Sequence, residues 1–212
     1  MRRLIFSAFK HLFVGNDLGT SSAKYSGAVY GGDGCIYFIP RNAVRILKLD
    51  IATQTTSFVG SNLSSANDKY FGGVLAQDGC IYFAPFTAAQ ILKFNVATHE
   101  ISYLPKIGGT YYGGCLAQDG CIYFTPGNST QIMKLDIATQ TTSFVGSNLS
   151  SANDKYFGAC LGNDGCIYFA PHTSRKILKL KVNVMPNPND TVIPSNLASL
   201  PTSNYNKYFN KY

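Results

Sequence analysis

The sequence predicts an all-β fold made of four tandem repeats, and three observations predict it. First, the stretch KYFGGVLAQDGCIYFAP at residues 69–85 returns in altered form from residues 24, 110 and 155, with Asp-Gly pairs spaced 45, 41 and 45 residues apart. Second, Tyr, Phe, Ile and Val alternate at period two within each copy, which is typical of strands. Third, Gly and Pro interrupt each copy about every 8 to 12 residues. A period of about 40 to 50 residues with four strands per unit indicates β-propeller blades.

The second repeat shows how each strand is delimited. Its four strands are expected at residues 69–76, 80–85, 90–96 and 101–105. The pair Asp78-Gly79 is expected to turn the first strand into the second, because Gly accepts a positive φ and Asp hydrogen-bonds within its own turn. Pro85 is expected to end the second strand, where a missing N–H breaks no ladder. A catalytic or metal role for the turn aspartates is the alternative, but they have no companion ligands at metal spacing.

The whole chain, residues 1–212, is expected to form a single domain with repeats at about 24–68, 69–109, 110–154 and 155–206. These repeats give four complete four-stranded blades. The terminal segments 4–15 and 207–212 repeat parts of the motif and are expected to close the ring as a partial fifth blade. Residues 192–197 then supply the fourth strand of the last blade. The alternative is four-bladed closure, in which the N-terminal strand completes the last blade.

The motif DGCIYFIP followed by RILKLDIATQTT resembles the tandem-repeat β-propeller families, in particular the YVTN and kelch-like group. The matching positions are Asp33, Gly34, Tyr37, Asp50, Ala52 and Thr53. The resemblance implies a propeller over about residues 13–208 and no particular activity, because propellers host unrelated functions. Asn95 and Lys181 replace Asp50 in two later repeats, so no acidic ring is expected there.

The formal net charge of +7 gathers at the ends of the chain. The body is close to neutral, and its one dense basic cluster, within residues 175–181, has no interleaved aromatic residues, which argues against nucleic-acid binding. No apolar run reaches the roughly 18 to 20 residues of a membrane-spanning helix, so a soluble chain is expected. The basic N-terminus is assigned to the repeat because Phe13 and Lys24 lie 45 residues before Phe58 and Lys69. A targeting segment is the alternative.

The six cysteines predict free thiols. Four of them occupy one repeat position, while Cys115 and Cys160 stand where other repeats have valine, so they are expected to behave as small buried side chains. Equivalent positions in different blades lie too far apart for disulfides. Reduced thiols indicate an intracellular, reducing compartment. The cytoplasm is the first expectation, and an organelle is the alternative. No zinc spacing, nucleophile motif, phosphate loop or carboxylate pair is present, so no metal, no cofactor and no enzymatic activity are expected.

The loops after the second and fourth strands of each repeat are expected to share one face, which a rigid scaffold presents for binding. Candidate binding residues lie on these loops or at the start of the first strands: Lys24, Tyr25, Arg41, Asn42, Asn67, Asp68, Lys69, Tyr70, Phe86, Tyr111, Asn128, Asn153, Asp154, Lys155, Tyr156 and His172. The alternative for the tyrosines is packing between blades with satisfied hydroxyls.

These features predict a non-enzymatic binding or scaffold propeller that contacts a protein partner, for example as an accessory subunit of a larger assembly. The repeated Tyr, Asn and Asp residues keep a carbohydrate-binding, lectin-like propeller as the first alternative. A propeller enzyme, or a degenerate relative of one, is the second. If the terminal strands do not close the ring, they could pair with another copy and give a homo-oligomer.

Overall fold

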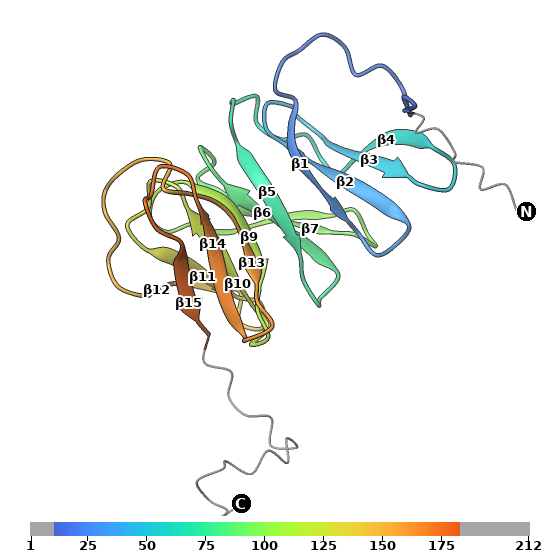
Figure 1. Cartoon of the computed structure of the whole chain (residues 1–212). Coiled ribbons are helices and arrows are strands. Elements are labelled where there is room, and N and C mark those ends of the chain that lie inside the picture. Colours follow the sequence, from blue (N-terminus) through green and yellow to red (C-terminus); the bar gives the residue numbers. More distant parts are fainter. Residues whose placement is uncertain (1–10, 183–212) are drawn as a thin grey trace, which may run out of the picture. The chain divides into compact units, whose positions relative to one another are not determined.

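The computed structural model describes residues 11–182, which belong to one compact unit. Fifteen strands form four antiparallel sheets, one for each repeat (Figure 1). Within each sheet the strands are hydrogen-bonded in chain order, so each sheet is a simple meander. The predicted all-β fold with one propeller blade per repeat is confirmed, and the sheets are called blades 1 to 4.

Blade 1 consists of β1 (Tyr25–Tyr30), β2 (Cys35–Pro40), β3 (Ile46–Asp50) and β4 (Thr55–Val59). Blade 2 consists of β5 (Tyr70–Leu75), β6 (Cys80–Pro85), β7 (Gln90–Asn95) and β8 (Ile101–Pro105). Blade 3 consists of β9 (Tyr111–Leu116), β10 (Cys121–Pro126), β11 (Ile132–Asp136) and β12 (Thr141–Val145). Blade 4 has three strands among the described residues: β13 (Tyr156–Leu161), β14 (Cys166–Pro171) and β15 (Leu178–Lys181).

The predicted strands of blade 2 agree closely with the observed ones. β6 and β8 have the expected bounds, while β5 is one residue shorter than expected at each end and β7 one residue shorter at its C-terminal end. The strand expected at 192–197 and the terminal strands at 4–10 and 207–212 lie outside the described residues. The described remainder of the N-terminal segment, 11–15, forms no strand. Five-bladed closure, four-bladed closure and the single domain over 1–212 therefore stay predictions.

The Asp-Gly turns do more than reverse the chain. Gly79 takes a φ of 73°, and Asp78 Oδ1 accepts the N–H of Cys80 at 3.2 Å. Asp78 Oδ2 accepts the hydroxyl of Tyr82 at 2.8 Å and pairs with Lys93 Nζ at 3.2 Å. Blades 3 and 4 repeat the ion pair between the equivalent lysine and aspartate, at 3.5 and 2.9 Å. In blades 2 to 4 these strand lysines therefore neutralise the turn aspartate.

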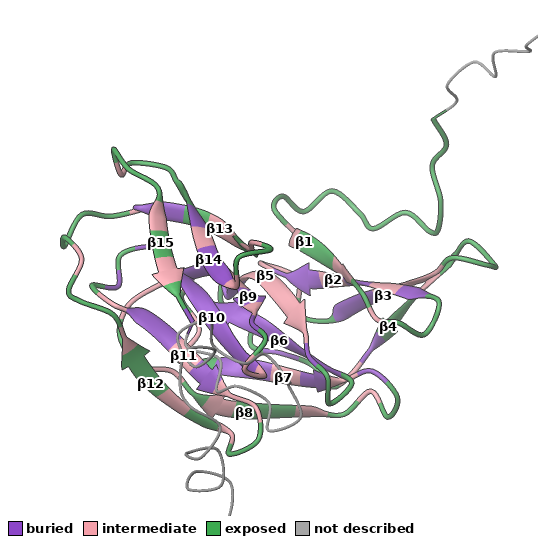
Figure 2. Ribbon diagram, turned by 60° about the horizontal axis from the view of Figure 1, so that its bottom comes forward, coloured by how far each residue is buried: buried purple, intermediate pink, exposed green. Residues whose placement is uncertain are grey.

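The core lies between successive blades. Ile81 and Phe83 of β6 pack in one cluster with Tyr37 of blade 1, whereas Tyr82 of the same strand packs in the next cluster with Phe124 of blade 3. Because alternate residues of a strand face opposite sides, the second strand of blade 2 is buried on both faces. Figure 2 shows this burial in β6 and β10, in contrast to the exposed outer strand β12.

The first strands β1, β5, β9 and β13 contact one another in chain order. Each begins with a bulge: in blade 2, Tyr70 pairs with Pro85 and Gly73 pairs with Phe83, which leaves one extra residue on β5. Gly72 lies in this bulge with a φ of 73°, and a Cβ on it would be 2.9 Å from the Cα of Gly113 in β9. Only glycine allows the two backbones to approach so closely.

The outward face of blade 4 differs from its counterparts. Ile177 is 66% exposed, although the equivalent residues in blades 1 to 3 are at most 3% exposed. Cys160 is likewise exposed, so the expectation of a buried side chain is wrong there, while the equivalent Cys115 is buried as expected. In blades 1 to 3 the next blade covers these positions, and no described residue does so in blade 4.

All six cysteines lie in the described part of the chain, and their thiols are free, as predicted. Within residues 11–182 no helix has the length and apolarity needed to cross a membrane.

Candidate functional site

A continuous row of aromatic rings runs from blade 2 to blade 4, and an arginine of blade 1 extends it. The row, here called the aromatic band, consists of Phe71, Phe86, Tyr112 and Phe157, with Arg41 at one end and His172 at the other. The centroid distances are 4.9 Å for Phe71–Phe86, 5.2 Å for Phe71–Tyr112 and 3.8 Å for the stacked pair Tyr112–Phe157. The Arg41 guanidinium lies 4.7 Å from the Phe71 centroid, and the His172 ring lies 4.4 Å from the Phe157 ring.

Two repeat positions interleave to build the aromatic band. The second residue of β5, β9 and β13 supplies Phe71, Tyr112 and Phe157, and each is followed by a bulge glycine with positive φ. The residue after the proline that ends β2, β6 and β14 supplies Arg41, Phe86 and His172. The bulge reorients the side chains that precede the glycine, which brings them against the loop residues.

Blade 3 has Gly127 at the loop position of the band. A Cβ on Gly127 would lie 2.7 Å from Cε2 of Tyr112. The absence of a side chain at Gly127 therefore leaves room for the Tyr112 ring, which keeps the row continuous between blades 2 and 4.

Two aspartates fix the charged and polar groups of the band. Asp68 forms an ion pair with the Nε of Arg41, and Asp154 accepts the Tyr112 hydroxyl at 2.6 Å. Burial, reinforced by this hydrogen bond, raises the pKa of Tyr112. His172 Nδ1 lies 3.1 Å from the carbonyl oxygen of Asp154. The result is a preorganised surface that can stack planar groups and bind a charge at either end.

Two predicted binding lysines are buried. Lys69 is 3% exposed and donates from Nζ to the Ala66 carbonyl at 2.8 Å. Lys155 is 2% exposed and donates to the carbonyls of Gly127 and Ala152. Burial lowers the pKa of both ammonium groups. Each lysine fastens the loop that enters its blade.

The predicted tyrosines at the start of β5, β9 and β13 are buried too, and the hydroxyls of Tyr111 and Tyr156 have partners, as in the packing alternative. The hydroxyl of Tyr111 donates to the Ile107 carbonyl at 2.7 Å and contacts Ser129 Oγ at 3.0 Å. Burial raises the pKa of Tyr111 to about 12. The equivalent Tyr156 accepts a hydrogen bond from Ser174 Oγ at 3.0 Å. Tyr25 is only half-buried and lines a pocket with Lys24.

The four predicted asparagines fasten loops to one another. Asn42 Oδ1 accepts the N–H of Asp68 at 2.8 Å, and Asn128 Oδ1 accepts the N–H of Thr110 at 2.6 Å. The carbonyls of Asn67 and Asn153 accept threonine hydroxyls at 2.7 and 2.8 Å.

Five of the sixteen predicted residues thus meet at the aromatic band: Arg41, Asp68, Phe86, Asp154 and His172. Sequence reasoning missed Phe71, Tyr112 and Phe157, which stand one residue after the predicted tyrosines. The glycine that follows each of them was the available signal, because a glycine near the start of a strand indicates a bulge.

The band contains no arrangement typical of catalysis. The Asp154 carboxylate is bonded to Tyr112, and His172 faces a backbone carbonyl and an aromatic ring. Over residues 11–182 no group of three or more His, Cys, Asp or Glu side chains is arranged to hold a metal ion.

No protein-family model matches the chain, and no curated protein matches it in sequence. Solved structures match it in fold. A catalytically inactive virginiamycin B lyase from Staphylococcus aureus, solved with quinupristin, is 18% identical with a TM-score of 0.62, covering 82% of this chain and 59% of the lyase. A streptogramin B lyase is 20% identical with a TM-score of 0.61 and the same two coverages. An auxiliary nutrient binding protein from Bacteroides ovatus is 14% identical with a TM-score of 0.58, covering 76% of this chain and 40% of that protein.

These similarities support a tandem-repeat β-propeller fold, and the fold alone. The chain spans 59% of the length of the two lyases and 40% of the nutrient binding protein. The finer assignment to the YVTN and kelch-like group stays a prediction.

Proposed function

We propose that this chain is a non-enzymatic binding propeller and that a segment of a partner protein docks on the aromatic band. The observation that carries this proposal is the unbroken row of rings from blades 2 to 4, with Arg41 of blade 1 at one end and His172 at the other. Aromatic residues and arginine are enriched in the energetically dominant parts of protein interfaces. A role as an accessory subunit of a larger assembly is compatible with this surface.

The state of the band side chains supports binding. Phe157 is 40% exposed, His172 is exposed, and Phe71, Phe86 and Arg41 are half-buried. Their ring contacts and the Asp68 and Asp154 bonds hold them before a partner arrives, so little conformational entropy is lost on binding. A partner segment with an aromatic or aliphatic anchor residue and an acidic residue toward Arg41 fits this chemistry.

The experiment is selection of binders from a random peptide library displayed on phage, followed by affinity measurements on purified variants. Phe157→Ala should weaken the binding of selected peptides by about tenfold or more, as at an interface hot spot. Phe144→Ala is the matched control, because Phe144 is 41% exposed but lies on the outer strand β12. It should change affinity by no more than about twofold.

A glycan array with the same variants tests the competing function. Sugar binding that Phe157→Ala abolishes, together with a peptide selection that yields no binder, would replace the protein-binding proposal by a carbohydrate-binding one. Equal losses in Phe157→Ala and Phe144→Ala would reject the band as the binding surface.

A further inference from the structure

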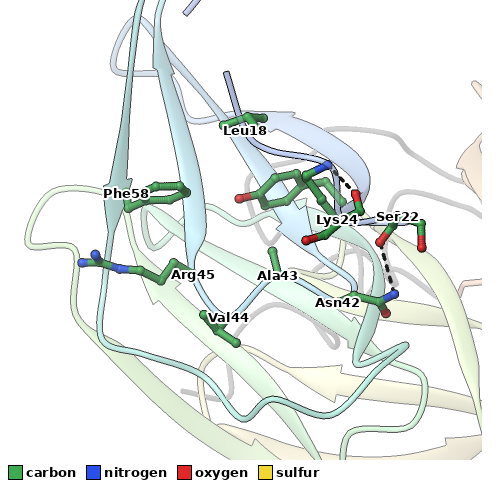
Figure 3. Close-up of a pocket in the computed structure, with 10 residues that line it drawn as sticks. Leu18, Ser22, Lys24, Asn42, Ala43, Val44, Arg45 and Phe58 are labelled. Atoms are coloured by element: carbon green, nitrogen blue, oxygen red, sulfur yellow. Dashed lines mark hydrogen bonds between the residues drawn. The ribbon is translucent and has the colours of Figure 1, made fainter. Parts of the chain in front are cut away.

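Two pockets occupy the same position in blades 1 and 2, and no residue of the aromatic band lines either of them. The blade 1 pocket has a volume of about 400 Å³ and the blade 2 pocket about 380 Å³. The shared lining positions lie 45 residues apart: Leu18 and Leu63, Lys24 and Lys69, Tyr25 and Tyr70, Ala43 and Ala88, Phe58 and Tyr103. Figure 3 shows the blade 1 pocket, with Phe58 on one side and Lys24 and Asn42 on the other.

Among the described residues, the tyrosine hydroxyl has a hydrogen-bond partner in blades 3 and 4 and none in blades 1 and 2. Ser129 and Ser174 contact the hydroxyls of Tyr111 and Tyr156. Blades 1 and 2 carry Ala43 and Ala88 at the serine position.

Tyr70 is only 4% exposed, and its hydroxyl has no hydrogen-bond partner within the described residues. The half-buried Tyr25 is in the same situation. Among the described residues only the Thr125 hydroxyl is a fully buried side-chain group without a partner, so the Tyr25 and Tyr70 hydroxyls are open to solvent and available to a ligand in the pocket.

The lysine of each pocket carries a charge that no side chain neutralises. Lys69 Nζ has one protein acceptor, the Ala66 carbonyl, whereas the equivalent Lys155 has two. Lys24 Nζ donates to the Ser21 carbonyl. Within the described residues neither Lys24 nor Lys69 forms an ion pair, and neither pocket has an acidic lining residue. Lys69 is buried and Lys24 is half-buried, and a partly desolvated cation without an ion-pair partner favours an anionic ligand.

The opposite wall of each pocket is apolar and aromatic. Phe58 and Tyr103 come from the outer strands β4 and β8, and Leu18 and Leu63 come from the loops that lead into each blade. The Arg45 guanidinium lies 5.6 Å from the Phe58 centroid and adds a second cation to the blade 1 pocket. Volumes near 400 Å³ suit a small molecule with a compact body.

We propose that the pockets of blades 1 and 2 each bind a small carboxylate. Its oxygens accept hydrogen bonds from the lysine ammonium and the tyrosine hydroxyl, and its body packs against Phe58 or Tyr103. Charge-assisted bonds of this kind are about twice as strong as neutral ones. Two chemical sources share this group, an acidic sugar and an aromatic acid. In blades 3 and 4 the equivalent tyrosine hydroxyls already contact Ser129 and Ser174.

The test measures binding of four probes to the purified chain by ligand-observed NMR and calorimetry. D-Galacturonate and phenylacetate carry the carboxylate, and D-galactose and phenylethanol are their neutral counterparts. We expect at least one carboxylate to bind at two sites per chain. Its neutral counterpart should bind with an affinity at least about tenfold lower. Galacturonate alone would identify an acidic-sugar site, and phenylacetate alone an aromatic-acid site. Equal binding of charged and neutral probes, or no carboxylate binding at millimolar concentration, would overturn the proposal.

Paired variants separate binding from folding. Tyr25→Phe with Tyr70→Phe should weaken carboxylate binding about tenfold and leave the melting temperature unchanged, because these hydroxyls have no protein partner. Tyr111→Phe with Tyr156→Phe should lower the melting temperature and leave carboxylate affinity unchanged. Ala43→Ser with Ala88→Ser should reproduce the satisfied hydroxyls of blades 3 and 4 and weaken binding without loss of stability. Unchanged affinity in the Tyr25 and Tyr70 pair contradicts the proposal.

Discussion

Ile91 and Ile177 occupy the same repeat position but have opposite surroundings. Ile91 is fully buried in the cluster between blades 2 and 3, against Ile122 and Phe124, while Ile177 is 66% exposed. Substitution by alanine removes three carbon atoms, which is a transfer free energy of about 2.4 kcal/mol at about 0.8 kcal/mol for each. At Ile91 the cavity left behind adds to this, so Ile91→Ala should lower the free energy of unfolding by about 3 kcal/mol. Ile177→Ala should change it by no more than about 0.5 kcal/mol.

Urea unfolding followed by far-UV circular dichroism and tyrosine fluorescence measures both effects, since the chain has 14 tyrosines and no tryptophan. With a denaturant slope of about 3 kcal/mol per molar, Ile91→Ala should lower the urea midpoint by about 1 M. The slope itself should stay unchanged, which shows that the difference is one of stability.

A large loss of stability in Ile177→Ala would refute the exposed outward face of blade 4. It would mean that another segment of the chain or a second copy covers Ile177 in solution. The two are separable, because stabilisation by a second copy makes the melting temperature depend on protein concentration. A loss below about 1 kcal/mol in Ile91→Ala would instead contradict the packing between blades.

Three further predictions concern single side chains. Iodoacetamide should alkylate Cys160 alone in the native protein, because Cys160 is exposed while Cys115 and the other thiols are buried. Mass spectrometry after brief labelling identifies the alkylated cysteine. Protection of Cys160 would show that this face of blade 4 is covered. Tyr82→Phe should lower the free energy of unfolding, measured by urea, by about 1 to 2 kcal/mol, and Tyr168→Phe should lower it by less. Both hydroxyls donate to the turn aspartate, but Tyr82 also accepts a hydrogen bond from Gln140 of blade 3. Equal losses in the two variants would show that this bond between blades adds no stability. Burial opposes ionisation of Asp78, but hydrogen bonds from Tyr82 and Lys93 hold its pKa below the ordinary value of 3.8. A carboxylate with a lowered pKa stabilises the fold above its unfolded pKa and loses this contribution as the pH falls through its folded pKa, so wild-type stability should drop from about pH 4 downward. The Asp78→Asn variant should be less stable than wild type at pH 7, and its urea midpoint should change less between pH 5 and pH 3. Urea midpoints that fall in parallel with pH in the two proteins would contradict this.

The blades could be predicted from the sequence because their limits are set by local chemistry. Asp78-Gly79 requires a turn and Pro85 ends a strand whatever surrounds them, so β6 has the expected bounds. Because the motif recurs at a regular spacing, the strands assigned in one repeat can then be assigned in the other three. The strands expected at 192–197 and 207–212 rest on the same pattern and lie outside the described residues.

The aromatic band could not be predicted in full, because it depends on one inserted residue. Alternation along β5 places Tyr70 and Phe71 on opposite faces, but it does not show which of the two reaches the surface of the loops. The bulge at Gly72 decides this, since the extra residue shifts the register between Tyr70 and Gly73. Tyr70 then enters the core between blades, and Phe71 contacts Phe86 and Tyr112.

The duplicated block at residues 48–72 and 134–158 separates the effect of sequence from the effect of neighbours. Gln54 and Gln140 have the same sequence around them and nearly the same φ, 57° and 56°. Gln54 bonds only to the Ile51 carbonyl among the described residues, whereas Gln140 also bonds to Tyr82 and Lys93 of the preceding blade.

The same comparison holds at the band, where Phe71 is half-buried and the identical Phe157 is 40% exposed. Identical residues therefore take different roles according to the blade that flanks them. A binding surface in a repeat protein is then specified by where the copies differ: His172 in place of Arg41, and Ser129 and Ser174 in place of Ala43 and Ala88. Exchange of these residues between blades should transfer ligand binding from one blade to another while the fold stays the same. The probe assays measure the binding, and circular dichroism measures the fold.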